Sequence, residues 1–158
     1  MILRLAWLSA LLFAAAVIFF SAIIGGVWLW GIATSPSMRE ARAIRDRLLE
    51  REIPAAEIFP GDWQALCIAG PYAVPVDVIA KGTELAQTPC DGWDEDWQAQ
   101  EMMTGLLLVS GRGCRAVPVR RDIFDAALLG GQCFTRASRP MLSLISRGSP
   151  PRQFLQIR

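Results

Sequence analysis

Cys67 is the residue of this chain that most directly raises a question of chemistry. It lies in the apolar stretch WQALCIAGPYAVP, residues 63–75, which holds the only tyrosine of the chain. A catalytic cysteine must be a thiolate, and it needs a neighbouring base, usually histidine, or a helix N-terminus. The chain contains no histidine, and the flanking Leu66 and Ile68 would provide an apolar setting that disfavours the thiolate. The pattern favours a disulfide cysteine over a nucleophile.

The four cysteines of the chain predict a disulfide framework. They include no C-x-x-C pair, and no histidine is present to complete a metal site. Three pairings are open to four cysteines. Cys67 lies inside the first predicted strand, and Cys133 begins a late strand that can neighbour it. Cys90 ends the loop before the second strand, and Cys114 opens the third. We predict the pairs Cys67–Cys133 and Cys90–Cys114, which require an oxidising compartment.

The segment DGWDEDW, residues 91–97, concentrates carboxylates of the kind that bind calcium. An EF-hand loop has a glycine at its sixth position and a glutamate at its twelfth. Counted from Asp91 or from Asp94, neither the glycine nor the glutamate occurs at the required position. We therefore expect a solvated acidic loop and no metal site. Trp93 and Trp97 either pack on the core or form an exposed aromatic patch for a partner.

A serine and the only lysine of the chain suggest a different chemistry. The stretch TSPSM places Ser37 and Met38 directly after an apolar segment, and Lys81 lies far downstream. These residues resemble the type I signal peptidases, in which a Ser-Met pair follows the membrane anchor and a distant lysine is the general base. The resemblance implies a serine–lysine membrane hydrolase. The family has a proline and a strand where this chain continues with REARAIR, a helical pattern, and an arginine where it has Gly82. We therefore predict no catalytic residue.

The segment GDWQALCIAGPY carries a second resemblance. It is similar to a W-x3-C-x2-G-P-Y motif of small exported or membrane-anchored bacterial proteins of uncharacterised function. The resemblance implies a single exported domain, and it brings no activity or cofactor with it. The matching residues are Trp63, Cys67, Gly70, Pro71 and Tyr72, with Cys133 as the downstream cysteine. We expect Gly70 and Pro71 to turn the chain out of a strand, which leaves Tyr72 to cover the sheet edge.

The N-terminal segment from residue 5 to residue 33 contains no charged residue. It exceeds the roughly 20 residues that a helix needs to cross a bilayer. Trp7 and Trp28 would lie about 31 Å apart along such a helix, which suits the two interfacial belts. The segment is too long for the apolar part of a signal peptide and lacks an Ala-x-Ala-like cleavage site. It predicts an uncleaved transmembrane anchor over residues 1–34, in contact with the lipid bilayer.

Two opposing features of the sequence indicate on which side of the membrane the rest of the chain lies. Arginines are more frequent after the apolar segment than before it, and the positive-inside rule then favours the cytoplasm. The even number of cysteines favours an oxidising compartment instead. We expect a single-pass protein of the bacterial inner membrane, with its C-terminal domain in the periplasm.

The chain after the anchor changes from helical to strand periodicity. Residues 35–54 are predicted to form an amphipathic juxtamembrane helix, with a Ser37–Glu40 capping box and with Pro54 ending it. Residues 55–158 are predicted to form a small disulfide-bonded α+β domain, a mostly antiparallel sheet of four or five strands with one or two helices. The expected strands are 64–69, 102–109, 114–120, one beginning at Cys133 and a last hairpin within 142–157. The expected short helices are 76–81 and 123–129.

Composition narrows the function that these elements can serve. The formal net charge of +1 argues against a nucleic-acid partner. We expect a membrane-anchored extracytoplasmic domain that acts as a binding or assembly module for a protein partner, without catalysis, cofactor or metal. The alternatives are an accessory subunit of a larger membrane complex and the serine–lysine hydrolase.

Overall fold

The computed structural model describes residues 17–23, 36–84, 90–93 and 101–158. The chain separates into two compact units, Met1–Ser35 and Pro36–Arg158, and each is described by itself. In the first unit, residues 17–23 form a helical segment with exposed side chains. Within this segment the hydroxyl of Ser21 donates a hydrogen bond to the carbonyl oxygen of Val17 at 2.8 Å.

The predicted N-terminal transmembrane helix is corrected by the structure. Within the part of the chain that the structure describes, no helix is long and apolar enough to cross a membrane. Residues 1–16 and 24–35 of the predicted anchor lie outside the described residues. The lack of charge in a segment shows that its residues can enter lipid. It does not determine how many of them form one continuous helix.

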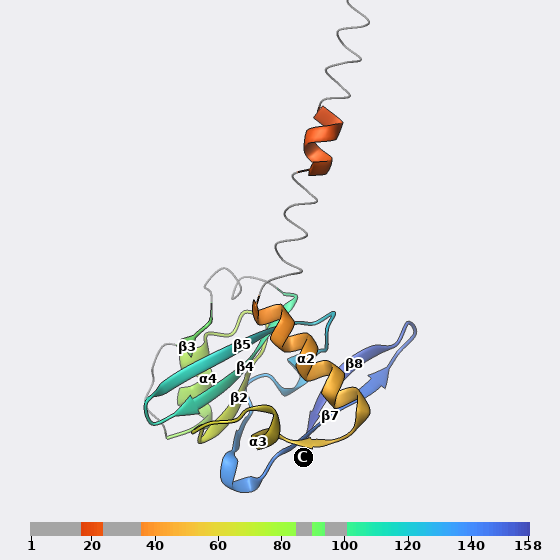
Figure 1. Cartoon of the computed structure of the whole chain (residues 1–158). Helices are drawn as coiled ribbons and strands as arrows, with labels where there is room; N and C mark the ends of the chain where they lie inside the picture. The colour runs from red at the N-terminus through yellow and green to blue at the C-terminus, as the bar shows by residue number, and fades with distance from the viewer. Residues whose placement is uncertain (1–16, 24–35, 85–89, 94–100) are drawn as a thin grey trace, which may run out of the picture. The chain divides into compact units, whose positions relative to one another are not determined.

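The second unit is α+β, and its larger sheet has five strands in the order β3-β5-β4-β2-β6 (Figure 1). β4 and β5 form an antiparallel hairpin, and β2 pairs antiparallel with both β4 and β6. The edge strand β3 runs parallel to β5. The bounds are Ala65–Ala69 for β2, Cys90–Asp91 for β3, Met103–Ser110 for β4, Gly113–Arg120 for β5 and Cys133–Thr135 for β6.

The last hairpin belongs to a second sheet, so the prediction of one sheet is wrong. β7 (Met141–Arg147) and β8 (Arg152–Ile157) pair with the short strand β1 (Ile53–Pro54) in the order β1-β7-β8. Pro54 disfavours helical geometry at Ile53, as predicted, and the extended backbone at Ile53 pairs with β7. Ile53 then lies opposite Leu142.

Helix α2 (Pro36–Glu50) covers one face of the five-stranded sheet (Figure 1). Its buried residues are the predicted apolar stripe, Met38, Ala41, Ile44 and Leu48. The guanidinium of Arg115 on β5 donates to both carboxylate oxygens of Glu40 on α2, at 2.6 and 2.7 Å. The other helices are α3 (Ala55–Ile58), α4 (Pro75–Gly82) and the 3₁₀ turns η1 (Ala127–Leu129) and η2 (Arg136–Ser138).

The prediction of a helix over residues 123–129 is wrong, because the backbone of Asp125 pairs with β8 instead. Its backbone N–H donates to the carbonyl oxygen of Gln153 at 2.8 Å, and its carbonyl oxygen accepts from the N–H of Leu155 at 2.9 Å. A residue that bridges to a strand in this way cannot supply the same groups to a helix. Only the 3₁₀ turn η1 remains of the predicted helix.

The core lies on both faces of the five-stranded sheet. Leu66 and Ile68 of β2 join the cluster beneath α2 and the second sheet, whereas Cys67 joins the cluster beneath α4. This alternation follows from the two-residue period of a strand. β2 is buried at every position because it is central in the sheet and covered on both faces, as its apolar run predicted.

Candidate functional site

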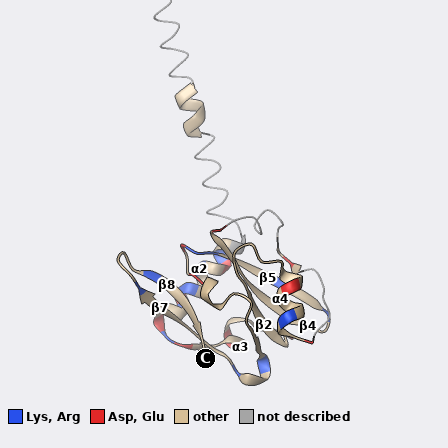
Figure 2. Cartoon of the chain, turned by 180° about the vertical axis from the view of Figure 1, so that it is seen from behind, with Lys and Arg blue, Asp and Glu red and all other residues tan. Residues whose placement is uncertain are grey.

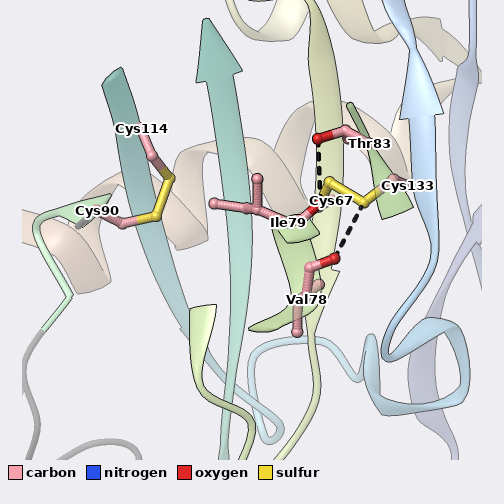
Figure 3. The surroundings of a disulfide bond; sticks show 7 residues. All are labelled: Cys67, Val78, Ile79, Thr83, Cys90, Cys114 and Cys133. Carbon is pink, nitrogen blue, oxygen red and sulfur yellow. Dashed lines mark hydrogen bonds between the residues drawn. A yellow bond between two sulfur atoms is a disulfide. The ribbon is translucent and has the colours of Figure 1, made fainter. Parts of the chain in front are cut away.

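The opposed residues of β2 and β6 form the first disulfide. Cys67 and Cys133 are direct partners in the antiparallel register, with Cα atoms 4.0 Å apart. Their sulfur atoms are bonded at 1.99 Å (Figure 3). Cys67 is fully buried, and Cys133 is partly exposed at the edge of the sheet. Cys67 therefore offers no thiol for catalysis.

The C-terminal half of α4 covers this disulfide closely. The sulfur of Cys133 lies 3.9 Å from the carbonyl oxygen of Val78, and a β-carbon placed on Gly82 would lie 2.2 Å from that sulfur. No residue larger than glycine fits at position 82 without moving the helix or the disulfide. The close contact with the disulfide thus requires glycine at position 82.

The second disulfide joins Cys90 of β3 to Cys114 of β5. These residues are register partners in the parallel pair, with Cα atoms 4.4 Å apart. Ile79 of α4 lies between the two disulfides, which share one face of the sheet (Figure 3). All four cysteines are in the described part of the chain and none of them is free. The prediction of a disulfide-bonded chain is confirmed, and the observed pairs are those chosen from the sequence.

Trp63 of the W-x3-C motif is buried at the start of β2. Its indole N–H donates to the carbonyl oxygen of Phe59 at 2.7 Å. The guanidinium carbon of Arg136 lies 5.1 Å from the centre of the Trp63 ring, within cation–π range. Arg136 also donates to the carbonyl oxygen of Gly61. Trp63 and Arg136 thus hold the segment before β2 against the segment after β6.

A largely apolar hollow of about 400 Å³ opens beside Trp63. Arg136 and Arg139 are its charged lining residues, and its other walls are Pro54, Ala55, Ala56, Pro140 and Met141. Arg139 is exposed, and its backbone has φ 53°, in the left-handed region. Its guanidinium makes no ion pair with any residue that the structure describes. We call this cavity the Trp63 hollow.

Two further hollows of about 430 and 300 Å³ also have Trp63 as a lining residue. Both contain Asp62, Ser110 and Arg112, which lie before β2 and at the β4–β5 turn. Trp63 is therefore common to three depressions around one end of the sheet. The sequence singled out Trp63 as part of a motif, but the arginines beside it are missing from that motif.

The Gly-Pro-Tyr part of the motif forms a turn at the other end of β2. The N–H of Ala73 donates to the carbonyl oxygen of Gly70 at 3.2 Å. A β-carbon on Gly130 would lie 3.2 Å from the Cα of Gly70, so the two glycines permit close packing of their turns. Tyr72 has φ 61° and is 60% exposed, so its side chain is not buried against the sheet edge.

The serine and lysine of the hydrolase alternative are not brought together. Ser37 lies in the first turn of α2, and Lys81 is exposed near the end of α4. α2 packs in the core cluster on one face of the five-stranded sheet, and α4 packs in the cluster on the other face. A general base must reach the proton that it removes, within about 3 Å or through one water.

The predicted acidic loop lies partly outside the described residues, since 94–100 are not described. Trp93, which is described, packs over β4, where a β-carbon on Gly105 would lie 2.2 Å from its ring. Its indole N–H meets no acceptor among the described residues. Within those residues, no group of three or more metal-binding side chains occurs.

Asp125 is a buried carboxylate that the sequence did not single out. It is 3% exposed, and its oxygens accept bonds from the Arg121 side chain at 2.8 Å and from the N–H of Ala127 at 2.8 Å. The hydrogen bond that Arg121 donates to the carboxylate of Asp125 raises the pKa of Arg121 above its ordinary value, so the guanidinium stays charged until the pH rises through that raised pKa. The only sequence signal was an aspartate inside a predicted helix.

Comparison of the chain with protein families, with curated proteins and with solved structures finds no match. The resemblance of the W-x3-C-x2-G-P-Y motif therefore stays a prediction.

Proposed function

We propose that the second unit is a binding or assembly module that works outside the cytoplasm and performs no catalysis. Two disulfides on one face of the sheet support an oxidising compartment such as the bacterial periplasm. The separation of Ser37 from Lys81 and the absence of a free thiol count against a nucleophilic enzyme. The observation that carries the proposal is the Trp63 hollow.

The Trp63 hollow fits an apolar side chain of a partner protein with a carboxylate next to it. Its volume of about 400 Å³ falls within the usual range of ligand pockets, and its walls are mostly proline, alanine, methionine and tryptophan. Arg136 is already engaged by Gly61 and by the Trp63 ring. Arg139 is the cation that remains to pair with a carboxylate, and arginine pairs with that group through two parallel hydrogen bonds.

A small probe tests this proposal on the full chain in mild detergent. N-acetyl-phenylalanine carries an apolar ring beside a carboxylate, and its amide is the neutral control. Saturation-transfer NMR should detect binding of the acid, and Ala56→Phe, which fills the hollow from an exposed position, should abolish it. Ala80→Phe adds the same ring to an exposed position of α4, and it should leave binding unchanged. Equal binding by both variants would refute the hollow as the site.

The charge requirement is tested separately with Arg139→Asn. Asparagine tolerates the left-handed backbone at this position, so the variant removes the guanidinium without adding strain. We expect affinity for the acid to fall about tenfold and affinity for the amide to stay the same, because a charge-assisted hydrogen bond is lost. An equal loss for both probes would mean that Arg139 contributes shape rather than charge.

A further inference from the structure

The hairpin of β7 and β8 places two arginines directly opposite each other. Arg147 and Arg152 are register partners at the end of the hairpin, and both are exposed. Basic residues appear in blue on the hairpin in Figure 2. Neither arginine forms an ion pair with any residue that the structure describes. Like charges in this position destabilise a strand pair, so an anion that binds both guanidinium groups would remove an electrostatic cost.

The hydrogen-bond pattern of the hairpin brings these two arginines within reach of one anion. Met141 and Arg158 exchange backbone hydrogen bonds of 3.0 and 3.1 Å. Hydrogen-bonded positions recur at every second residue of an antiparallel pair, so Arg147 and Arg152 also form such a pair. The Cα atoms of a pair of this kind lie about 5.5 Å apart. The two side chains leave the same face of the sheet, and both guanidinium groups can therefore bind a single anionic group.

A hollow of about 400 Å³ lies between the hairpin and the C-terminal half of α2, with Arg152 in its wall. Its apolar lining residues are Leu49, Met102, Ile123 and Pro151. Leu49 is 53% exposed and Met102 is 48% exposed, so two large apolar side chains of these walls meet solvent. The hollow shares no lining residue with the Trp63 hollow. We call it the Arg152 hollow.

The other three charged side chains that line the Arg152 hollow already have partners of opposite charge. The ion pairs are 2.7 to 2.9 Å long, and they are Arg45–Asp46, Arg121–Asp125 and Asp122–Arg120. Among the described residues, Arg152 is thus the charged lining residue that lacks an ion-pair partner. The hollow therefore combines apolar walls with a positive charge that remains to be neutralised.

We infer that the Arg152 hollow binds a phosphate monoester that carries a short apolar group. The apolar group lies against Leu49 and Met102, and the phosphate oxygens accept hydrogen bonds from Arg147 and Arg152. A phosphate suits this pair better than a carboxylate does. Its three terminal oxygens can accept from two arginines at once, whereas the two oxygens of a carboxylate are occupied by one bidentate arginine.

The same chemistry occurs in soluble metabolites and in phospholipid headgroups, and the size of the hollow favours the soluble source. A volume of about 400 Å³ lies near the lower end of the range for ligand pockets, which accommodates a short chain and not two long acyl chains. We therefore expect phosphatidate in mixed micelles not to displace a short-chain phosphate monoester. Displacement by an equal concentration of phosphatidate would overturn the assignment to a soluble ligand.

Isothermal titration calorimetry with hexyl phosphate, on the full chain in a mild neutral detergent, tests the site. Inorganic phosphate lacks the apolar group and hexanoate lacks the phosphate, so each should bind at least about tenfold more weakly. Inorganic phosphate that binds as tightly as hexyl phosphate would exclude the apolar walls from the site. Hexanoate that binds as tightly would exclude the arginine pair. Either result overturns the inference.

The arginine pair is tested by Arg147→Gln and Arg152→Gln. Each variant should lower the affinity for hexyl phosphate about tenfold, because it removes a charge-assisted hydrogen-bond donor. Arg39→Gln is the control, since Arg39 is also exposed and forms no ion pair within the described part of the chain; it should bind like the wild type. Unchanged affinity in both hairpin variants would overturn the inference. Intact disulfides, checked by non-reducing mass spectrometry, show that a loss of affinity is not a loss of fold.

The apolar wall is tested separately by Leu49→Ala. The affinity for hexyl phosphate should fall about threefold or more, and the affinity for inorganic phosphate should stay the same, because only the apolar contact is reduced. Leu128→Ala shortens another exposed leucine, on η1, and should change neither affinity. An equal loss for both ligands in Leu49→Ala, or no loss for hexyl phosphate, would contradict the placement of the apolar group against α2.

Discussion

Gly82 shows how a residue without a side chain determines the surroundings of a disulfide. Its Cα faces Cys133 so closely that a β-carbon would lie 2.2 Å from the sulfur. The helix α4 can therefore lie against the disulfide only if position 82 is glycine. Trp93 and Gly105 repeat this arrangement on β4. At both positions the size of one residue decides how closely a covering element packs on the sheet.

We expect Gly82→Ala to lower the free energy of unfolding by about 1–3 kcal/mol, because the added methyl group overpacks the contact with Cys133. Urea unfolding of the oxidised protein measures the change. Gly111→Ala is the control, since its nearest neighbour would be 3.9 Å away and its backbone does not require glycine. That variant should change stability by less than about 1 kcal/mol. Equal losses in the two variants would show that α4 does not pack on the disulfide.

At the scale of elements, Asp125 joins the segment after β5 to the second sheet. Its backbone pairs with β8 on both sides of Phe154, and its carboxylate holds Arg121 and the N–H of Ala127. One residue thus satisfies four polar groups at the junction of the two sheets. Removing its carboxylate leaves a partly buried guanidinium and a backbone donor without their partner.

Asp125→Ala should destabilise the fold by about 3 kcal/mol, since it breaks a buried ion pair by removing one member. Asp122→Ala is a matched control, because Asp122 pairs with Arg120 at the surface, where such pairs contribute about 0–1 kcal/mol. Urea unfolding of both variants gives the comparison. A loss at position 125 no larger than that at position 122 would contradict the joining role of Asp125.

Some elements of this fold could be predicted from the sequence, and others could not. β2, β4 and β5 could be predicted because each is an apolar run bounded by glycine or proline, and α2 because its apolar residues recur at helical spacing. The second sheet could not, because Ile53 finds its partner Leu142 across most of the chain. The Trp63 hollow could not be predicted for the same reason, because its walls come from separate segments that only the folded chain brings together.

For the whole molecule, the two disulfides constrain chain segments of very different length. Cys67 and Cys133 are 66 residues apart, and Cys90 and Cys114 are 24 apart. In the chain-entropy model, such cross-links stabilise by about 3–4.5 kcal/mol each. Domains of this size are stable by only about 5–15 kcal/mol. The fold therefore depends on oxidation, which links its stability to the compartment in which it resides.

Replacing each pair by alanine tests this dependence. C67A/C133A should lower the free energy of unfolding by about 4 kcal/mol, and C90A/C114A by slightly less, because the shorter loop has less entropy to lose. Denaturant unfolding of both double variants gives the order. A larger loss for C90A/C114A would mean that local packing, rather than loop length, sets the contribution of each disulfide.

The most direct test of a disulfide-held module in an oxidising compartment is thiol trapping in intact cells. Cells that produce the full chain are treated with N-ethylmaleimide before lysis, and the purified protein is digested and mapped without reduction. We expect the disulfide-linked peptides Cys67–Cys133 and Cys90–Cys114, with no alkylated cysteine. Alkylated Cys67 in the folded protein would contradict this expectation, because the chain would then reside and fold in a reducing compartment.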